Sequence, residues 1–348
     1  MTELDHHIWD LGFPHWMDVT GRRSIAGLVN AKGRQGVYVL GFANGERYVG
    51  RASNVVNRFV QHQLSRPDIV SFTFRPVAAK TIADEERRCI HTLESKGVPL
   101  RNLAEMSVVR GERQFDKLVS PEEQEHWLTV WEEPSPYPDP RVVDDDLRRR
   151  YTRRFRTFMQ QPLANDALWL LGTYVAFAIP FPNRTELTFW SMSCLPQPGV
   201  YSRVNINMQE VLTVFDHGEG LIASFHLAKS PIEREWGPDW RESLSNIAPI
   251  TDHYWKPGGG DQFQLQAPLE FALLLMTDRL FHEAMMTLNL RLMRKGPTYY
   301  STSHCIDLVT EAHAVRERRW DDLKELWELF DALDDPHEDA SSVGKEST

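Results

Sequence analysis

The chain has 348 residues, 41% of them hydrophobic and 25% charged, which argues against a collagen-like or wholly disordered protein. This length is sufficient for two or three domains, each with its own hydrophobic core. Its three cysteines, Cys89, Cys194 and Cys305, lie far apart without a CxxC spacing, so neither a disulfide framework nor a cysteine zinc site is supported.

The formal net charge of −10 is unevenly distributed along the chain. Residues 21–120 contain 17 Lys and Arg against 9 Asp and Glu, a balance of +8, and the remainder has 22 against 40, a balance of −18. Because binding depends on the local field at the docking face, the N-terminal part can bind polyanions such as DNA.

No membrane segment is predicted. The first residues lack the basic and apolar regions of a secretion signal. The longest uncharged apolar stretch, 167–181, is shorter than the ~18 residues that span a bilayer, so we expect a buried helix there. A reducing cytoplasm is the simplest compartment for such a chain.

A proline-rich acidic segment, "EEPSPYPDPRVVDDD" at 132–146, cannot sustain a helix or a central strand and predicts a semi-rigid linker. After about residue 331 few apolar residues remain, which predicts disorder. The expected organisation is α+β, with the following parts: an N-terminal extension 1–20, a small domain 21–130, a linker 131–147, a larger α+β domain 148–330 and an acidic tail 331–348.

The segment "RRRYTRRFR", residues 148–156, contains six arginines. It is interpreted either as the solvated start of a helix or as a patch that follows a phosphate backbone. The candidate nucleic-acid contacts are Arg51, Arg148, Arg149, Arg150, Arg153 and Arg154.

Two short β-prone runs, 37–40 and 47–49, flank an Asn-Gly pair that predicts a hairpin and places Tyr38 and Tyr48 on paired strands. A helix follows, capped by Ser53 or Asn54, with Arg58 and His62 on one face. The next elements are an alternating strand in 68–77 and a helix that begins with a capping box of Thr81 and Asp84.

Glu86 lies on the apolar stripe of this second helix, formed by Ile82, Cys89, Ile90 and Leu93. A buried carboxylate is costly unless it is paired or coordinates a metal ion. The sequence alone leaves both explanations open: an ion pair with Arg58 or another base, or a metal site.

The order of these elements resembles the GIY-YIG nuclease domain over residues 34–103. "GVY" is followed after ten residues by "YVG", then by Arg58 and His62, by Glu86, and by "GVPLRN", which ends at Asn102. Valine replaces isoleucine in both triplets, and cysteine stands at 89 where leucine is usual.

The resemblance implies hydrolysis of DNA phosphodiester bonds with one divalent cation, Mg²⁺ or Mn²⁺, held by Glu86. It also implies that Arg58 contacts the scissile phosphate and that Asn102 helps to fix the site. Tyr38 is implied as the general base, assisted by Tyr48 or His62, although the choice among these three stays open. A free tyrosine has a pKa near ~10, so this role requires the cation and Arg58 to lower it.

The C-terminal half has no comparable catalytic pattern. It predicts a helix over 164–180, strands within 186–194, 203–216 and 221–227, one long helix over 268–295 and a last helix over 306–330. His217, His226, His253 and His304 lack metal-ligand spacing, and "STSHC" near residue 303 is more typical of a capped turn than of a nucleophile. Many of its aromatic residues are expected in the core, with stacking on a flipped base as the alternative: Trp169, Trp190, Trp236, Trp240 and Trp255.

The expected function is therefore a metal-dependent DNA endonuclease whose C-terminal domain supplies target choice or assembly, with restriction of foreign DNA as one role. Homo-oligomerisation is compatible with this function. Two alternatives stay open: a non-catalytic nucleic-acid-binding protein with a degenerate nuclease fold, and a subunit whose acidic half recruits a protein partner.

Overall fold

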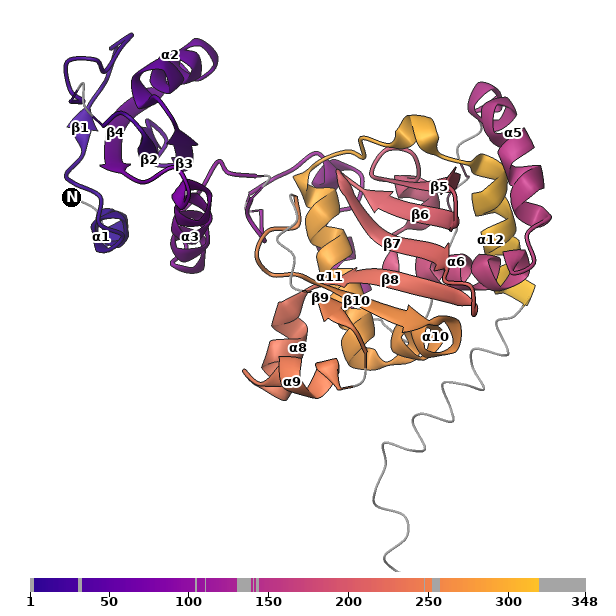
Figure 1. The fold of residues 1–348 in the computed structure, drawn as a ribbon. Coiled ribbons are helices and arrows are strands. Elements are labelled where there is room, and N and C mark those ends of the chain that lie inside the picture. The colour runs from indigo at the N-terminus through magenta and orange to yellow at the C-terminus, as the bar shows by residue number, and fades with distance from the viewer. Residues whose placement is uncertain are drawn as a thin grey trace, which may run out of the picture. The chain divides into compact units, whose positions relative to one another are not determined.

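The structure is a computed structural model that describes residues 3–30, 33–103, 105–109, 111–129, 139, 141, 144–246, 248–251 and 257–318. The chain divides into two compact units, Met1–Gly111 and Glu112–Thr348 (Figure 1). Each unit combines helices with an antiparallel sheet, which confirms the α+β class.

The first unit does not have the predicted boundaries. Residues 1–20 are part of it, because Ile8 and Leu11 lie in its core and Met17 pairs with Phe72 in its sheet. Residues 112–129 belong instead to the second unit, where Phe115 and Trp127 join the core. Most of the predicted linker 131–147 and the whole tail 331–348 lie outside the described residues.

The sheet of the first unit has four strands rather than three, in the order β1-β4-β2-β3, and all its pairs are antiparallel. The strands β2 and β3 form the predicted hairpin, in which Tyr38 lies opposite Gly50 and Leu40 lies opposite Tyr48. The strands are β1 (Met17–Asp18), β2 (Gly36–Phe42), β3 (Arg47–Ala52) and β4 (Ile69–Pro76).

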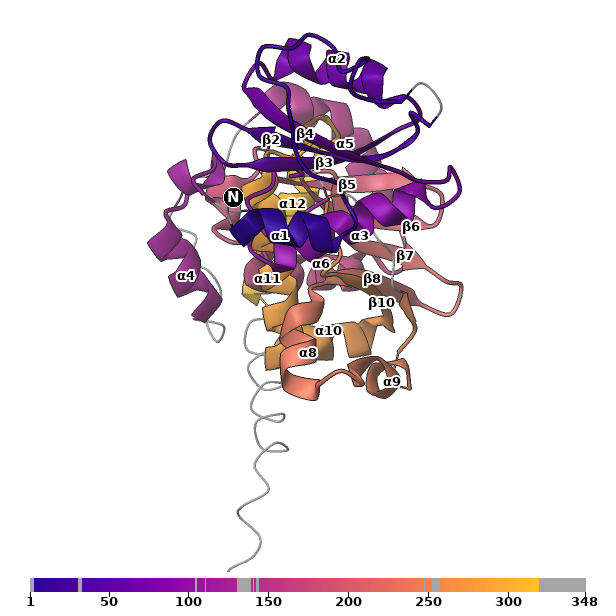
Figure 2. The same ribbon diagram turned by 90° about the vertical axis from the view of Figure 1, so that its left-hand side faces the viewer.

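Helices cover both faces of this sheet (Figures 1 and 2). Because side chains alternate along a strand, Tyr38, Leu40 and Phe72 share a core with α2 (Val55–Ser65). Val37, Val39 and Val49 point to the other face, where α1 (Glu3–Asp10) and α3 (Ile82–Ser95) pack.

The two helix starts of this unit differ. Of the two predicted caps, Ser53 and Asn54, it is Asn54 that caps α2, since its side chain accepts hydrogen bonds from the backbone N–H groups of Val56 and Asn57. The capping box at Thr81 is wrong: Thr81 has helical backbone angles, and its hydroxyl donates to the Ala78 carbonyl at 3.3 Å. A capping side chain needs an extended backbone to reach the free N–H groups.

The second unit contains a six-stranded antiparallel sheet in the order β5-β6-β7-β8-β10-β9. The predicted strand segments 186–194, 203–216 and 221–227 correspond to β5 through β8, whereas β9 and β10 were not predicted. The strands are β5 (Trp190–Gln197), β6 (Val200–Ile206), β7 (Gln209–Asp216), β8 (Leu221–Leu227), β9 (Ile250–Thr251) and β10 (Phe263–Pro268).

The core of the second unit lies between this sheet and helices that include α6 and α11. The helical elements are η1 (Phe115–Lys117), α4 (Pro121–Thr129), α5 (Asp145–Met159), α6 (Ala164–Ala178), α7 (Pro182–Thr185), α8 (Lys229–Trp236), α9 (Trp240–Ser245), α10 (Leu269–Thr277), α11 (Arg279–Lys295), η2 (Ser301–Ser303) and α12 (Ile306–Arg318). Residues 319–330 of the predicted last helix lie outside the described residues.

The helix predicted over 268–295 is two helices. The chain leaves the helical conformation at Asp278, whose ψ is 126°, and the Asp278 side chain accepts hydrogen bonds from the N–H groups of Leu280 and Phe281. Asp278 therefore ends α10 and caps α11.

The apolar segment 167–181 lies largely in the buried helix α6, as predicted. Among the described residues, the helices are too short or too polar to cross a membrane.

Candidate active site

Tyr38 and His62 form a buried hydrogen bond in the first unit. The Tyr38 hydroxyl lies 2.7 Å from Nε2 of His62, and both side chains are at least nine-tenths buried. Tyr38 comes from the central strand β2 and His62 from the third turn of α2. The packing of α2 on this face of the sheet therefore creates the contact.

Tyr48 completes an aromatic cluster with these two residues. Its ring lies 5.1 Å from the His62 ring and 6.4 Å from the Tyr38 ring. The guanidinium of Arg66 stacks over Tyr48 at 4.3 Å, a cation–π contact. The structure thus brings together both tyrosines and the histidine singled out in the sequence.

Gly50 of the "YVG" triplet is necessary for this geometry. A Cβ atom at Gly50 would lie 2.5 Å from Cζ of Tyr38 and 2.9 Å from Cε1 of Tyr48. Because Gly50 lies opposite Tyr38 in the hairpin, the Tyr38 ring covers the glycine across the strand. The glycine is there to leave room for the phenol, a requirement that the tertiary structure makes visible.

The protonation states of the pair follow from burial and from nearby charges. Burial raises the pKa of Tyr38 above its ordinary value and Tyr48 adds to this, while the hydrogen bond and charge of Arg58 partly oppose it. Burial lowers the pKa of His62 to about 4, helped by the positive charges of Arg66 and Arg58. At neutral pH a neutral phenol therefore meets a neutral imidazole.

Arg58 is exposed on α2, where its guanidinium donates to Gln61 at 3.0 Å. It also acts on both tyrosines, because interaction with Tyr38 and Tyr48 raises the pKa of Arg58. The cationic side chain thus remains next to both phenols and accessible to an anion.

Glu86 lies on α3 and pairs with a base that had not been specified. Its Oε2 lies 3.0 Å from Nε of Arg51 on β3, and the exposed fractions of the two side chains are 13% and 45%. Glu86 is also one of the charges that raise the pKa of Tyr38 and of Tyr48. The carboxylate is therefore paired and electrostatically coupled to the tyrosines.

A cavity of about 340 Å³ adjoins the ion pair. It is lined by Gln35, Arg51, Ala52, Ser53, Ala79 and Ile82. Arg51 is the charged residue of this lining, which makes the cavity a suitable place for an anion.

Asn102 holds the edge of β3 rather than reaching the tyrosines. Its Oδ1 accepts from the Val49 N–H at 2.8 Å, and its Nδ2 donates to the Val49 carbonyl at 2.7 Å. Arg47 and Leu100 form a parallel bridge beside it. Asn102 thus fixes the strand that carries Tyr48 and Arg51.

The residues present limit what cation could be held here. Within the described part of the chain there is no group of three or more His, Cys, Asp or Glu side chains that could hold a metal ion. A single carboxylate fits Mg²⁺, which keeps most of its waters, and does not fit zinc with several protein ligands. The candidate holder is Glu86, at the cost of its pairing with Arg51.

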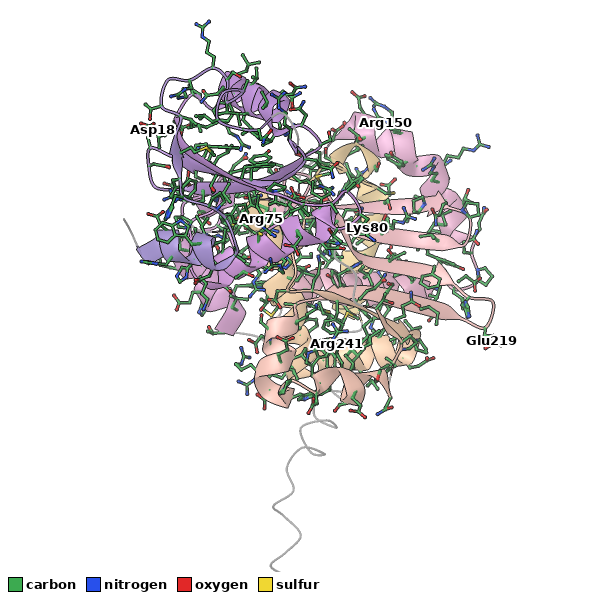
Figure 3. All side chains as sticks on the ribbon, turned by 60° about the vertical axis from the view of Figure 1, so that its left-hand side comes forward. Asp18, Arg75, Lys80, Arg150, Glu219 and Arg241 are labelled. Atoms are coloured by element: carbon green, nitrogen blue, oxygen red, sulfur yellow. The ribbon has the colours of Figure 1, made fainter. Side chains whose placement is uncertain are left out.

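The arginine run forms an amphipathic helix, α5, with Leu147 and Phe158 buried. Arg148 forms an ion pair within the second unit, because its Nε lies 3.0 Å from Oδ1 of Asp307. The other arginines of α5 are exposed: Arg149, Arg150, Arg153, Arg154 and Arg156. Figure 3 labels Arg150 among them.

The second unit contains a buried charge cluster that was not predicted. Glu186 accepts two hydrogen bonds from Arg141, at 2.9 and 2.7 Å, and lies 2.9 Å from Nε2 of His304. These bonds outweigh burial and hold the pKa of Glu186 at about 2. His304 Nδ1 accepts from the Met192 N–H, so the cluster joins β5 to the start of α12. We interpret it as structural.

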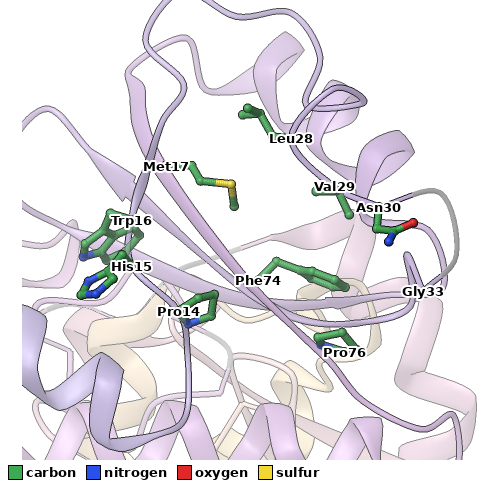
Figure 4. Close-up of a pocket in the computed structure, with 10 residues that line it drawn as sticks. All are labelled: Pro14, His15, Trp16, Met17, Leu28, Val29, Asn30, Gly33, Phe74 and Pro76. Atoms are coloured by element: carbon green, nitrogen blue, oxygen red, sulfur yellow. The ribbon is translucent and has the colours of Figure 1, made fainter.

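A second cavity of the first unit, about 660 Å³, is lined mainly by apolar side chains such as Met17, Leu28 and Phe74 (Figure 4). The candidate site residues do not line this cavity, although Phe74 lies opposite Tyr38 in the sheet. It therefore does not belong to the site described above.

Two site residues escaped sequence reasoning: Gly50 as a steric requirement and Arg51 as the partner of Glu86. The hairpin register contained a signal for Gly50, since pairing Leu40 with Tyr48 places Gly50 opposite Tyr38. Searches against family models, curated proteins and solved structures found no match to this chain.

Proposed function

We propose that the first unit is a GIY-YIG-type endonuclease domain that hydrolyses DNA phosphodiester bonds with a divalent cation in the cytoplasm. The observation that carries the proposal is the Tyr38–His62 hydrogen bond of 2.7 Å, with Arg58 and Glu86 acting electrostatically on the same phenol. Hydrolysis of a phosphodiester needs a base for water and a cation near the developing negative charge.

The Tyr38–His62 pair supplies the base. The Tyr38 oxygen accepts a proton from water while its own proton moves to Nε2 of His62, which is unprotonated at neutral pH. Arg58 acts on both partners: it lowers the pKa of Tyr38, which favours loss of the phenol proton, and its charge also lowers the pKa of His62. When the bond from phosphorus to the leaving oxygen breaks, that oxygen takes a proton from solvent water, and His62 returns its extra proton through Tyr38 to solvent.

Arg58 and Glu86 complete the proposed site. The exposed fork of Arg58 is suited to a non-bridging phosphate oxygen. A divalent cation held by Glu86 would stabilise negative charge on the phosphate and the leaving oxygen. Gly50 leaves room for the Tyr38 ring, and Asn102 holds the strand β3 that carries Tyr48.

One observation favours the alternative of a non-catalytic nucleic-acid-binding protein. The Arg51–Glu86 ion pair satisfies the carboxylate without a cation. Under this alternative the basic surfaces of the first unit and of α5 bind DNA, and Glu86 serves only to hold α3 against β3.

Nicking of supercoiled DNA by the full-length protein distinguishes the two functions. We expect nicking in Mg²⁺ or Mn²⁺, none in a chelator, and none by Glu86→Gln, which keeps the size of the side chain but removes its charge. The matched control is Glu94→Gln on the same helix, whose carboxylate accepts from the backbone of Ser107 and Val108. A folded Glu86→Gln protein that still nicks DNA would contradict the nuclease function.

A further inference from the structure

The ion pair between Arg51 and Glu86 occupies the carboxylate that the proposed nuclease uses for its cation. Arg51 Nε lies 3.0 Å from Glu86 Oε2. A carboxylate oxygen that is paired with a guanidinium at this distance is less available to a divalent cation. Cation binding at Glu86 therefore competes with Arg51.

We propose that Arg51 is a phosphate-binding residue that leaves Glu86 when DNA binds, so that DNA and the divalent cation bind cooperatively. This inference rests on the proposed nuclease function. It assigns Arg51 a task different from that of Arg58, which acts directly on the Tyr38 phenol.

The exposure of the two partners indicates which of them moves. The Arg51 side chain is 45% exposed, whereas Glu86 is 13% exposed and lies on a packed helix. A partly solvated ion pair contributes little to stability. A phosphate, which accepts two parallel hydrogen bonds from a guanidinium, can therefore draw Arg51 away while Glu86 stays in place.

The cavity beside Arg51 provides a place for that phosphate. Its volume of about 340 Å³ is ample, since about 10–15 Å³ of the same measure holds one water molecule. Ser53 and Gln35 line it together with Arg51, so hydroxyl and amide groups are available beside the guanidinium. The polar residues of the lining suit a phosphodiester group, and Ala52, Ala79 and Ile82 offer an apolar surface to its sugar.

Coupling of this kind is reciprocal. If DNA raises the affinity for the cation, the cation must raise the affinity for DNA by the same factor. The expected factor is about fivefold, the equivalent of the modest contribution of a partly exposed ion pair.

Binding of Mn²⁺ alone to the full-length protein, followed by electron paramagnetic resonance, tests the competition. We expect Arg51→Gln to bind Mn²⁺ about fivefold more tightly than the wild type and Glu86→Gln to lose the site. Arg87→Gln is the matched control. It also removes one positive charge, but from the residue that follows Glu86 on α3 and pairs with Asp84. Unchanged or weaker Mn²⁺ binding by Arg51→Gln overturns the proposal.

The same titration with a non-cleavable phosphorothioate duplex tests the coupling. The wild type should gain affinity for Mn²⁺, and Arg51→Gln should gain less; equal gains overturn the proposal. If the wild type nicks DNA and Glu86→Gln does not, but Arg51→Gln binds Mn²⁺ like the wild type, only the inference on Arg51 fails. If neither the wild type nor Arg51→Gln binds more Mn²⁺ than Glu86→Gln, the metal-dependent function fails as well.

Discussion

The Tyr38 hydroxyl lies 2.7 Å from Nε2 of His62 although the two residues are 24 positions apart on different elements. The bond is buried, and the pKa values of its partners are displaced in opposite directions, upward for the phenol and downward for the imidazole. Such opposed displacements keep both groups neutral at neutral pH, so the unprotonated Nε2 of His62 can accept the hydrogen bond of the phenol.

Tyr38→Phe removes the hydroxyl while keeping the ring over Gly50. We expect nicking to fall by about 10²–10⁴-fold, the usual contribution of a general base. The free energy of unfolding should fall by only about 1 kcal/mol, the typical contribution of one hydrogen bond. Nicking rates and denaturant unfolding measure these two effects.

The control for Tyr38→Phe is Tyr174→Phe. Tyr174 is also fully buried, and its hydroxyl is bonded to Asn289 in the second unit. This control should lose similar stability but keep its nicking rate. Equal nicking by the two variants would show that the Tyr38 hydroxyl has no catalytic role.

Gly50→Ala places a methyl group against the Tyr38 ring. We expect destabilisation by about 1–3 kcal/mol, as for overpacked cores, together with loss of nicking because the phenol is displaced. Gly27→Ala is the control, since a Cβ there meets no atom within 4 Å. Thermal melts of both variants give the comparison, and a fully stable Gly50→Ala protein would refute the steric role.

His62 makes stability depend on pH. Its folded-state pKa of about 4 lies below the unfolded value near ~6.5, so between these values the unfolded chain binds more protons. The contribution of His62 to the free energy of unfolding is therefore retained above about pH 6.5. It is lost as the pH drops towards 4, and the loss at pH 5 is about 2 kcal/mol. His62→Gln should reduce this loss, as measured by unfolding at pH 5 and pH 7; an unchanged loss would exclude His62 as its source.

Three exposed arginines of α5, Arg149, Arg150 and Arg153, test DNA binding by the second unit. Their joint change to alanine should weaken DNA binding and reduce the slope of log affinity against log salt by about 0.9 per lost phosphate contact. Nicking at saturating DNA should persist. Filter binding between 50 and 200 mM salt provides the measurement.

The control for the α5 variant removes the same charge elsewhere in the second unit, by changing Lys229, Arg234 and Arg241 of α8 and α9 to alanine. If this control weakens DNA binding as much as the α5 variant, general charge accounts for the effect and α5 has no specific role.

Glu186→Gln tests the structural interpretation of the buried cluster. Glu186 is completely buried and bonded to Arg141 and His304, so its neutralisation leaves the partly buried guanidinium of Arg141 without its counter-charge. We expect a loss of about 3–5 kcal/mol in the free energy of unfolding and unchanged nicking by the folded protein. Selective loss of nicking with intact stability would instead indicate a catalytic role for the cluster.

The amino-acid sequence determined those features that depend on neighbouring residues. Asn44 and Gly45 predicted the hairpin, the pair Ser53 and Asn54 predicted the start of α2, and alternation in β4 predicted its two faces. These patterns are local, because a turn, a cap or a strand face is set by a few successive residues. The break at Asp278 belongs to the same class, because Asp278 caps α11 through the next residues of the chain.

Only the tertiary structure decided which distant groups meet. The sequence showed that Glu86 needs a partner, but Arg51 became that partner because β3 and α3 pack together. The sequence also singled out Asn102, but it did not show that the Asn102 side chain bonds both the N–H and the carbonyl of Val49. Periodicity defines the face on which a side chain lies, whereas its partner depends on the register and packing of elements far apart in the chain.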